Sequence, residues 1–137
     1  MIAEDYVSFE IAKLLKEKGF DCECRGYYDT TKHLDYMLEH SGSEMDSNDG
    51  PDCYISAPTI QMAMKWLREV HNKIIVPSIS LDDRTSSTIN HYTVGIWYVP
   101  KNNGGAFCYT SPAPYKGYPS FEEACESAIK YCLENLI

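Results

Sequence analysis

The hydrophobic and polar positions of residues 54–77 follow two periods in succession. From 56 to 72 the apolar residues recur every three or four positions, which predicts an amphipathic helix. Ser56 is the expected N-cap, Pro58 is tolerated in the first turn, and Asn72 can take the left-handed conformation that ends a helix. Residues 74–76 are a β-branched run, and Pro77 disfavours a long central strand there. The buried stripe of the helix is expected to be Ile60, Ala63, Met64, Leu67 and Val70.

Two further helices are predicted near the ends of the chain. Residues 8–18 begin at a Ser8 N-cap and stop at Gly19, after a run of lysines that suits the helix dipole. The last helix starts with a capping box made by Ser120 and Glu123. Their expected apolar faces are Val7, Ile11, Leu14 and Leu15 in the first, and Phe121, Ala124, Cys125, Ala128, Ile129, Cys132, Leu133 and Leu136 in the last.

The strands are predicted from alternation and turn residues. Residues 22–29 indicate a short strand, whereas residues 31–38 fit either one helical turn or a strand. Residues 89–99 alternate and predict the longest strand. The Lys-Asn-Asn-Gly-Gly turn at 101–105 predicts that residues 106–109 return as a hairpin.

This order of elements predicts one α+β domain over residues 1–137. We expect a small antiparallel sheet with about three helices packed on one face, in two layers. Residues 39–52 are rich in Ser, Gly, Asn, Asp and Glu, and they predict a mobile acidic loop within that domain.

The net charge of −8 narrows the choice of partners. It argues against direct binding to nucleic acid or to an anionic membrane, since both need local positive charge. The N-terminus lacks the features of a signal peptide, and no apolar run approaches the roughly 20 residues that span a bilayer. The expected location is therefore the cytoplasm, and another protein or a second copy is the expected partner. The same charge leaves open an acidic DNA mimic that inhibits a DNA-binding protein.

Metal binding is the first chemical alternative. The side chains that would converge on a zinc ion are Cys22, Cys24, Cys53, His33 and His40, but zinc sites usually use Cys-x2-4-Cys pairs and this chain has none. Counted from Asp46, the acidic loop lacks the Gly at position 6 and the Glu at position 12 of a calcium-binding EF-hand. No metal and no cofactor are predicted.

Catalysis by a cysteine is the second alternative. Cys108 or Cys53 would be the nucleophile, with His33, His71 or His91 as the base. No local motif supports such a set, and no Gly-rich phosphate loop is present. A non-enzymatic accessory or protein-interaction domain is therefore the preferred interpretation, with a small Cys/His enzyme as a remaining alternative.

An exposed aromatic sheet face is the predicted binding site. If Tyr92, Val94, Ile96 and Tyr98 face the helices, the opposite face carries the candidate partner-binding residues, which are His91, Trp97, Phe107 and Tyr109. A shift of one residue in register would invert this and place Trp97 and Phe107 in the core.

Three passages resemble a group of small proteins encoded in gut bacteria, their phages and mobile elements. They are residues 7–21, residues 55–72 and the Ser-Phe-Glu-Glu-Ala helix start at 120–124. The resemblance implies no catalytic residue. Because accessory genes of this kind often encode proteins that bind another protein, it implies a binding role. The acidic stretch at 39–52 and the six cysteines depart from the pattern of the group.

Overall fold

The computed structural model describes residues 4–29, 31–36, 48, 54–80, 91–100, 105–112 and 117–137. Its backbone contacts separate the chain into two compact units, residues 1–63 and residues 64–137. Helix α2, Ile60–His71, contributes its first turn to the first unit and its remainder to the second. The predicted acidic loop at 39–52 lies outside the described residues, apart from Asn48.

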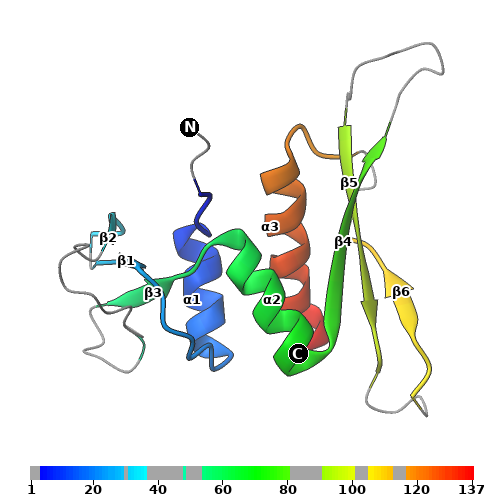
Figure 1. The fold of residues 1–137 in the computed structure, drawn as a ribbon, viewed down its shortest axis with the longest axis horizontal. Helices are drawn as coiled ribbons and strands as arrows, with labels where there is room; N and C mark the ends of the chain where they lie inside the picture. The colour runs from blue at the N-terminus through cyan, green and yellow to red at the C-terminus, as the bar shows by residue number, and fades with distance from the viewer. Residues whose placement is uncertain are drawn as a thin grey trace. The chain divides into compact units, whose positions relative to one another are not determined.

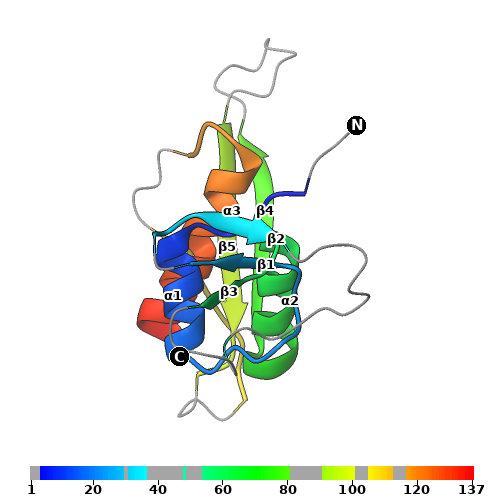
Figure 2. The ribbon, with the colours of Figure 1, turned by 90° about the vertical axis from the view of Figure 1, so that its left-hand side faces the viewer.

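Within its described residues the first unit contains a three-stranded antiparallel sheet, helix α1 and the first turn of α2. Its strands lie side by side in the order β2-β1-β3 (Figure 2). Strand β1 aligns Tyr27 with Asp35 on one side and with Ser56 on the other. Helix α1 packs with β3. The elements are α1 (Phe9–Glu17), β1 (Gly26–Tyr28), β2 (Leu34–Tyr36) and β3 (Ile55–Ala57).

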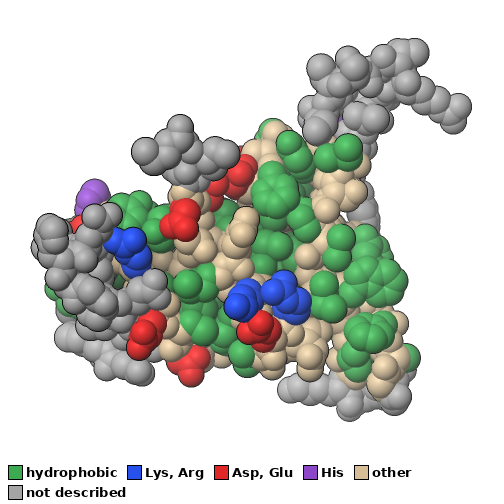
Figure 3. Space-filling model, viewed as in Figure 1, with side chains coloured by type: hydrophobic (Ala, Val, Ile, Leu, Met, Phe, Trp, Pro, Cys, Tyr) green, Lys and Arg blue, Asp and Glu red, His purple; other side chains and the backbone are tan. Residues whose placement is uncertain are grey.

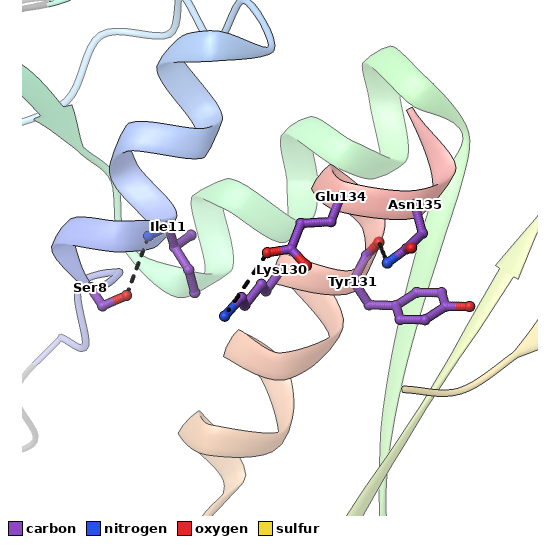
Figure 4. Close-up of polar contacts among 6 residues, drawn as sticks. All are labelled: Ser8, Ile11, Lys130, Tyr131, Glu134 and Asn135. Atoms are coloured by element: carbon purple, nitrogen blue, oxygen red, sulfur yellow. Dashed lines mark hydrogen bonds and ion pairs between the residues drawn. The ribbon is translucent and has the colours of Figure 1, made fainter. Parts of the chain in front are cut away.

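Both predicted ends of α1 are confirmed. The Ser8 hydroxyl accepts a hydrogen bond from the Ile11 amide at 3.4 Å, which caps the helix N-terminus (Figure 4). At the other end Gly19 has a φ of +88°, and the Phe20 amide donates to the Leu15 carbonyl at 2.9 Å. This is the Schellman arrangement that a glycine permits. It turns the chain so that Phe20 is buried.

Asn48 links two parts of the first unit that are distant in the sequence. Its side-chain amide donates to the Phe20 carbonyl at 3.0 Å, and its side-chain oxygen accepts from the Ser56 amide at 3.1 Å. One side chain thus satisfies a backbone acceptor after α1 and a backbone donor on β3. Asn48 was predicted only as part of a loop, because local sequence does not indicate such a distant pair of partners.

The sequence pattern of residues 31–38 fits either a helical turn or a strand. In the structure, residues 34–36 form strand β2. The turn before it is organised by Asp29, whose carboxylate accepts from the Thr31 hydroxyl at 2.6 Å, the Thr31 amide at 2.8 Å and the His33 amide at 3.1 Å. These hydrogen bonds, the one from the Thr31 side chain foremost, lower the pKa of Asp29 below its usual value. The turn is therefore best stabilised when Asp29 is charged.

We expect Asp29→Asn to lower the melting temperature of the protein at pH 7 and to have less effect in acid. A carboxyl whose pKa is lowered by folding stabilises the fold above its unfolded pKa, and that contribution is lost as the pH falls through the folded pKa. Melting curves of the wild type and the variant should therefore converge below about pH 4. Asp21→Asn, an exposed site, is the matched control. An equal deficit at every pH would contradict this role of the charge.

Helix α2 begins three residues later than a Ser56 cap would require. That prediction is wrong because Ser56 lies in strand β3 and is buried. The Thr59 hydroxyl instead accepts from the Met62 amide at 3.1 Å. Asn72 ends the helix with a φ of +55°, as predicted. The stripe prediction is wrong at Val70, which is 58% exposed.

The second unit holds a larger antiparallel sheet in the order β4-β5-β6, with bounds β4 (Lys73–Ser80), β5 (His91–Tyr98) and β6 (Cys108–Thr110). The predicted pairing of the last two strands is confirmed. Strand β4 is longer than the 74–76 run and continues through Pro77, which aligns with Val94. A proline is tolerated because β4 is an edge strand of this sheet.

Helix α3, Phe121–Tyr131, lies along one side of β4 and β5 (Figure 1). Its Ser120 hydroxyl accepts from the Glu123 amide at 3.1 Å, which confirms the predicted cap. The helix continues as a π-helical turn, η3 (Cys132–Leu136), where the Asn135 side chain donates to the Tyr131 carbonyl and Lys130 pairs with Glu134 (Figure 4). Its predicted apolar face is buried at Ala124, Cys125, Ala128, Ile129, Cys132 and Leu133.

The α+β class and the antiparallel pairing are therefore confirmed. The strands among the described residues form two three-stranded sheets, where the sequence pattern indicated one. In the part of the chain that the structure describes, no helix is long and apolar enough to cross a bilayer.

Candidate protein-interaction face

Strand β5 presents two chemically different faces. Val94 and Ile96 are buried, and Ile96 has no exposed surface. Trp97, the next residue, is 43% exposed. Since helix α3 packs on β4 and β5, the buried positions mark the side that the helix covers. The predicted facing of this strand is confirmed, and the register that would have buried Trp97 is excluded.

Trp97 and Tyr109 form a cross-strand pair on the uncovered side. They are directly opposite in the ladder between β5 and β6, and their ring centroids are 4.9 Å apart. Tyr109 is 57% exposed, so much of this aromatic pair is in contact with solvent. Aromatic pairs of this kind are large, stiff contact surfaces, which makes them common at protein interfaces.

The Tyr109 ring packs closely against Gly95. A Cβ atom built on Gly95 would meet the Tyr109 hydroxyl and would lie within 2.5 Å of the ring atoms Cε2 and Cζ. Gly95 is buried although its strand neighbour Trp97 is exposed. The Tyr109 ring therefore covers Gly95, and a larger side chain at this position would displace it.

Two more apolar residues extend this surface. Val76 on β4 aligns with Gly95 and is 44% exposed. Phe107 lies two residues before Tyr109 and is 63% exposed. We call Val76, Trp97, Phe107 and Tyr109 the aromatic face.

His91 does not belong to the aromatic face. It begins β5, six residues before Trp97, and at the rise of a strand this places it roughly 20 Å away. A Cβ atom on Gly117 would lie 2.9 Å from the Cβ of His91, so His91 packs beside that loop residue. The structure thus brings together Trp97 and Tyr109, places Phe107 nearby in the chain, and separates His91 from them.

The aromatic face carries no formal charge. On this side of the described strands the residues are Ile74, Val76, Ser78, His91, Thr93, Gly95, Trp97 and Tyr109. Figure 3 shows hydrophobic side chains gathered over the sheet of β4 to β6, with the charged side chains of that view elsewhere. Charged residues are depleted at the centres of protein interfaces, so this composition suits burial against a partner.

A small cavity of about 210 Å³ lies beside Tyr109. Strand β5 contributes Thr93 and Val94, and the chain after β6 contributes Ser111 and Pro112. Gly117 and Tyr118 complete the described lining. Cavities that hold drug-sized ligands are about 300–1,000 Å³. This one therefore suits a single ring-sized group.

The proposed metal ligands are not brought together within the described residues. Among those residues, no group of three or more His, Cys, Asp or Glu side chains is placed to hold a metal ion. Cys24 is buried, and its thiol donates to the Gly26 carbonyl at 3.6 Å. Cys53, His40 and Asp46 lie outside the described residues.

Cys108 and His91, one of the pairs considered for catalysis, are also far apart. Cys108 aligns with Tyr98, and His91 is seven residues further along β5, or roughly 23 Å away. His71 packs against the Trp66 ring, with ring centroids 4.5 Å apart.

Two other cysteines are buried. Burial, and to a lesser extent the nearby Glu122, raises the pKa of Cys125 to about 11. Burial also raises the pKa of Cys132 to about 12 although Lys73 opposes it, so both thiols are protonated near neutral pH.

Three parts of this region were not predicted from the sequence. They are Val76, the contact of the Tyr109 ring with Gly95, and the cavity. The glycine inside an alternating strand was the one local signal, because such glycines often mark close approach by another group. The cavity depends on where the chain leaves β6 and where it returns to β5 at Tyr118, and no local pattern indicates that.

Comparisons of the chain with protein-family models, with curated proteins and with solved structures find no match. The likeness to small proteins of gut bacteria and mobile elements therefore stays a prediction. Inference about function rests on the geometry of the aromatic face.

Proposed function

We propose that this protein is a non-enzymatic protein-interaction module that binds its partner, another protein or a second copy, through the aromatic face. The observation that carries the proposal is the exposed Trp97–Tyr109 pair, on the side of the sheet opposite α3. Tryptophan and tyrosine are enriched among residues that contribute most to binding, and their rings lose little entropy when they are covered.

The test compares binding and folding in the same variants. Trp97→Ala and Tyr109→Ala should each weaken self-association or partner capture by about tenfold or more, since truncation of a buried aromatic anchor often costs about 2 kcal/mol of binding free energy. Their melting temperatures should stay close to that of the wild type. Sedimentation velocity over a range of concentrations reports self-association, and capture on immobilised protein followed by mass spectrometry reports a partner.

Two further variants make the result specific. Gly95→Ala displaces the Tyr109 ring while both aromatic residues remain in the chain, so it should weaken binding too. Tyr36→Ala removes an exposed tyrosine from the first unit and should leave binding unchanged. Unfolding of Trp97→Ala, or equal losses in Tyr36→Ala, would show that the face was wrongly assigned.

The acidic DNA mimic is supported by a separate observation. Residues 1–63 contain five basic and thirteen acidic residues, a net charge of −8, whereas residues 64–137 contain seven of each. All of the excess negative charge thus belongs to the first unit. A mimic would bind a basic DNA-binding protein through that unit, with an affinity that falls steeply as salt is added. Two measurements distinguish a DNA mimic from a protein that binds through the aromatic face. A mimic competes with DNA for its partner, and this binding weakens as salt is added. Trp97→Ala would leave the binding of a mimic unchanged.

A further inference from the structure

Strand β4 forms an open edge of the sheet in the second unit. The strand order β4-β5-β6 leaves one side of β4 without a neighbouring strand. Within the described residues, no isolated bridge and no further backbone hydrogen bond occupies that side. The pairing of β4 with β5 continues without a bulge over eight residues, Lys73–Ser80. An edge of this length pairs readily with another strand unless charges, bulges or prolines interrupt it.

The hydrogen bonds of β5 identify the residues of β4 whose backbone groups point to the open edge. The Tyr92 amide donates to the Tyr118 carbonyl at 2.8 Å, and the Tyr118 amide donates to the Tyr92 carbonyl at 2.7 Å. Both polar groups of Tyr92 thus point away from β4, so those of its ladder partner, Ile79, point away from β5. Because this direction is shared by alternate residues of an antiparallel strand, the groups of Ile75 and Pro77 also point to the open edge.

Pro77 interrupts the open edge without closing it. Its missing N–H belongs to that edge and not to the pairing with β5, which explains why β4 continues through it. Ile75 and Ile79 each keep a donor and an acceptor there, and Pro77 keeps its carbonyl. Lys73 is the single charged residue of the strand, and it is 7% exposed and lies over the Tyr98 ring. Strand β4 therefore has no exposed charge that would repel another strand.

The open edge is complementary to itself in one register. When two copies pair antiparallel about Val76, Ile79 of each copy lies opposite Lys73 of the other, and Ile75 lies opposite Pro77. Each N–H of the edge then has a carbonyl opposite it, and the Ile75 carbonyl alone loses a donor. A register centred on Pro77 would instead place the two prolines opposite each other, where neither could donate. Such self-complementarity is what an interface with twofold symmetry requires.

We infer that β4 pairs with β4 of a second copy in the register centred on Val76, which joins the two β4-β5-β6 sheets into one antiparallel sheet. The occupant is a second copy because the edge matches its own pattern of donors and acceptors. The second unit, with seven basic and seven acidic residues, also has no net charge that would repel its copy.

This interface uses a different surface from the Trp97–Tyr109 pair and goes beyond the proposed function. Val76, which is 44% exposed, would be covered at the centre of the interface. Trp97 and Tyr109 lie on strands that do not touch the second copy, so their rings stay available for another partner.

The first experiment locates the interface by disulfide cross-linking of the full chain. Val76→Cys places two thiols in a non-hydrogen-bonded pair with Cα atoms about 4.5 Å apart, which a disulfide can span. Ser78→Cys is the matched control, because its two Cα atoms would be four residues out of register, or roughly 14 Å apart. Both variants keep the natural cysteines. We expect a covalent dimer from Val76→Cys under mild oxidation, with the bond mapped to position 76, and no additional dimer from Ser78→Cys.

The second experiment measures the dimer by sedimentation velocity over a range of concentrations. Ile79→Pro removes an N–H from the open edge while leaving the pairing with β5 possible, as Pro77 does naturally. It should raise the dimer Kd about tenfold or more, because each dimer loses two hydrogen bonds. Ile79→Val keeps the N–H and should leave the Kd within about twofold. Melting temperatures of both variants show whether they are folded, and the cross-linking result decides if Ile79→Pro is not.

The remaining outcomes separate this inference from the proposed function. Equal cross-linking of the two cysteine variants, or a wild type that stays monomeric at every concentration, overturns the pairing of β4. If Trp97→Ala dissociates the dimer and Ile79→Pro does not, the copies meet through the aromatic face, so the proposed function stands and the β4 inference falls. If Ile79→Pro dissociates the dimer while Trp97→Ala changes neither dimerisation nor partner capture, the β4 inference stands and the proposed function falls.

Discussion

Ile96→Ala is expected to lower the free energy of unfolding by about 2–5 kcal/mol, the range for removing a buried aliphatic side chain. Ile96 has no exposed surface and lies on the side of β5 that α3 covers. The loss has two parts, the transfer of the removed methyl and methylene groups and the cavity that remains. Urea denaturation with an unchanged m-value would measure it as a lower midpoint.

Two other substitutions in the same sheet serve as controls for Ile96→Ala. Ile79→Ala makes the same chemical change at a site that is 51% exposed in the same sheet, so its cost should be a fraction of that at Ile96. Trp97→Ala should reduce binding with a small effect on stability. If Trp97→Ala proved as destabilising as Ile96→Ala, the uncovered side of β5 would be core, and the proposed function would lose its basis.

Phe20→Ala is the second large effect, and we expect about 3–5 kcal/mol. Phe20 is 2% exposed and follows the glycine that ends α1. Its carbonyl accepts from Asn48 and its amide donates to Leu15, so the residue joins three parts of the first unit. Removal of the ring leaves these backbone bonds possible but takes away the buried surface that holds the chain against α1.

Phe107→Ala is the matched control because it removes the same ring from a site that is 63% exposed. Its effect on stability should be within about 0.5 kcal/mol, the usual range for surface substitutions. Chemical denaturation followed by far-ultraviolet circular dichroism measures both variants. Similar losses at Phe20 and Phe107 would contradict the burial that distinguishes them.

The candidate site could be predicted from the sequence only in part. Alternation along 89–99 places Trp97 and Ile96 on opposite faces of the same strand. The turn at 101–105 returns the chain as a second strand, so Trp97, Phe107 and Tyr109 could be predicted from the sequence. His91 was included because alternation assigns a face but does not limit how far along the strand a cluster extends. Val76 was missed because it belongs to β4, whose alignment with β5 is a long-range pairing.

Elements whose signals are local could be predicted from the amino-acid sequence. Ser8, Gly19, Asn72 and Ser120 mark helix ends through hydrogen bonds and backbone conformations that involve residues at most a few positions away. The α+β class follows from the order of those elements. Where a local rule had a competitor it failed, as at Ser56, whose backbone pairs in β3 with β1.

Features that join distant residues could not be predicted in this way and depend on the complete fold. The division of the strands into two sheets, the bridge made by Asn48, and the pairing of Tyr118 with Tyr92 all depend on contacts across many residues. Such pairings are selected by the packing of the whole unit, because several partners satisfy the same local pattern equally well. The physical reason is that a strand's own sequence sets which face is apolar, while its neighbours determine what lies against each edge.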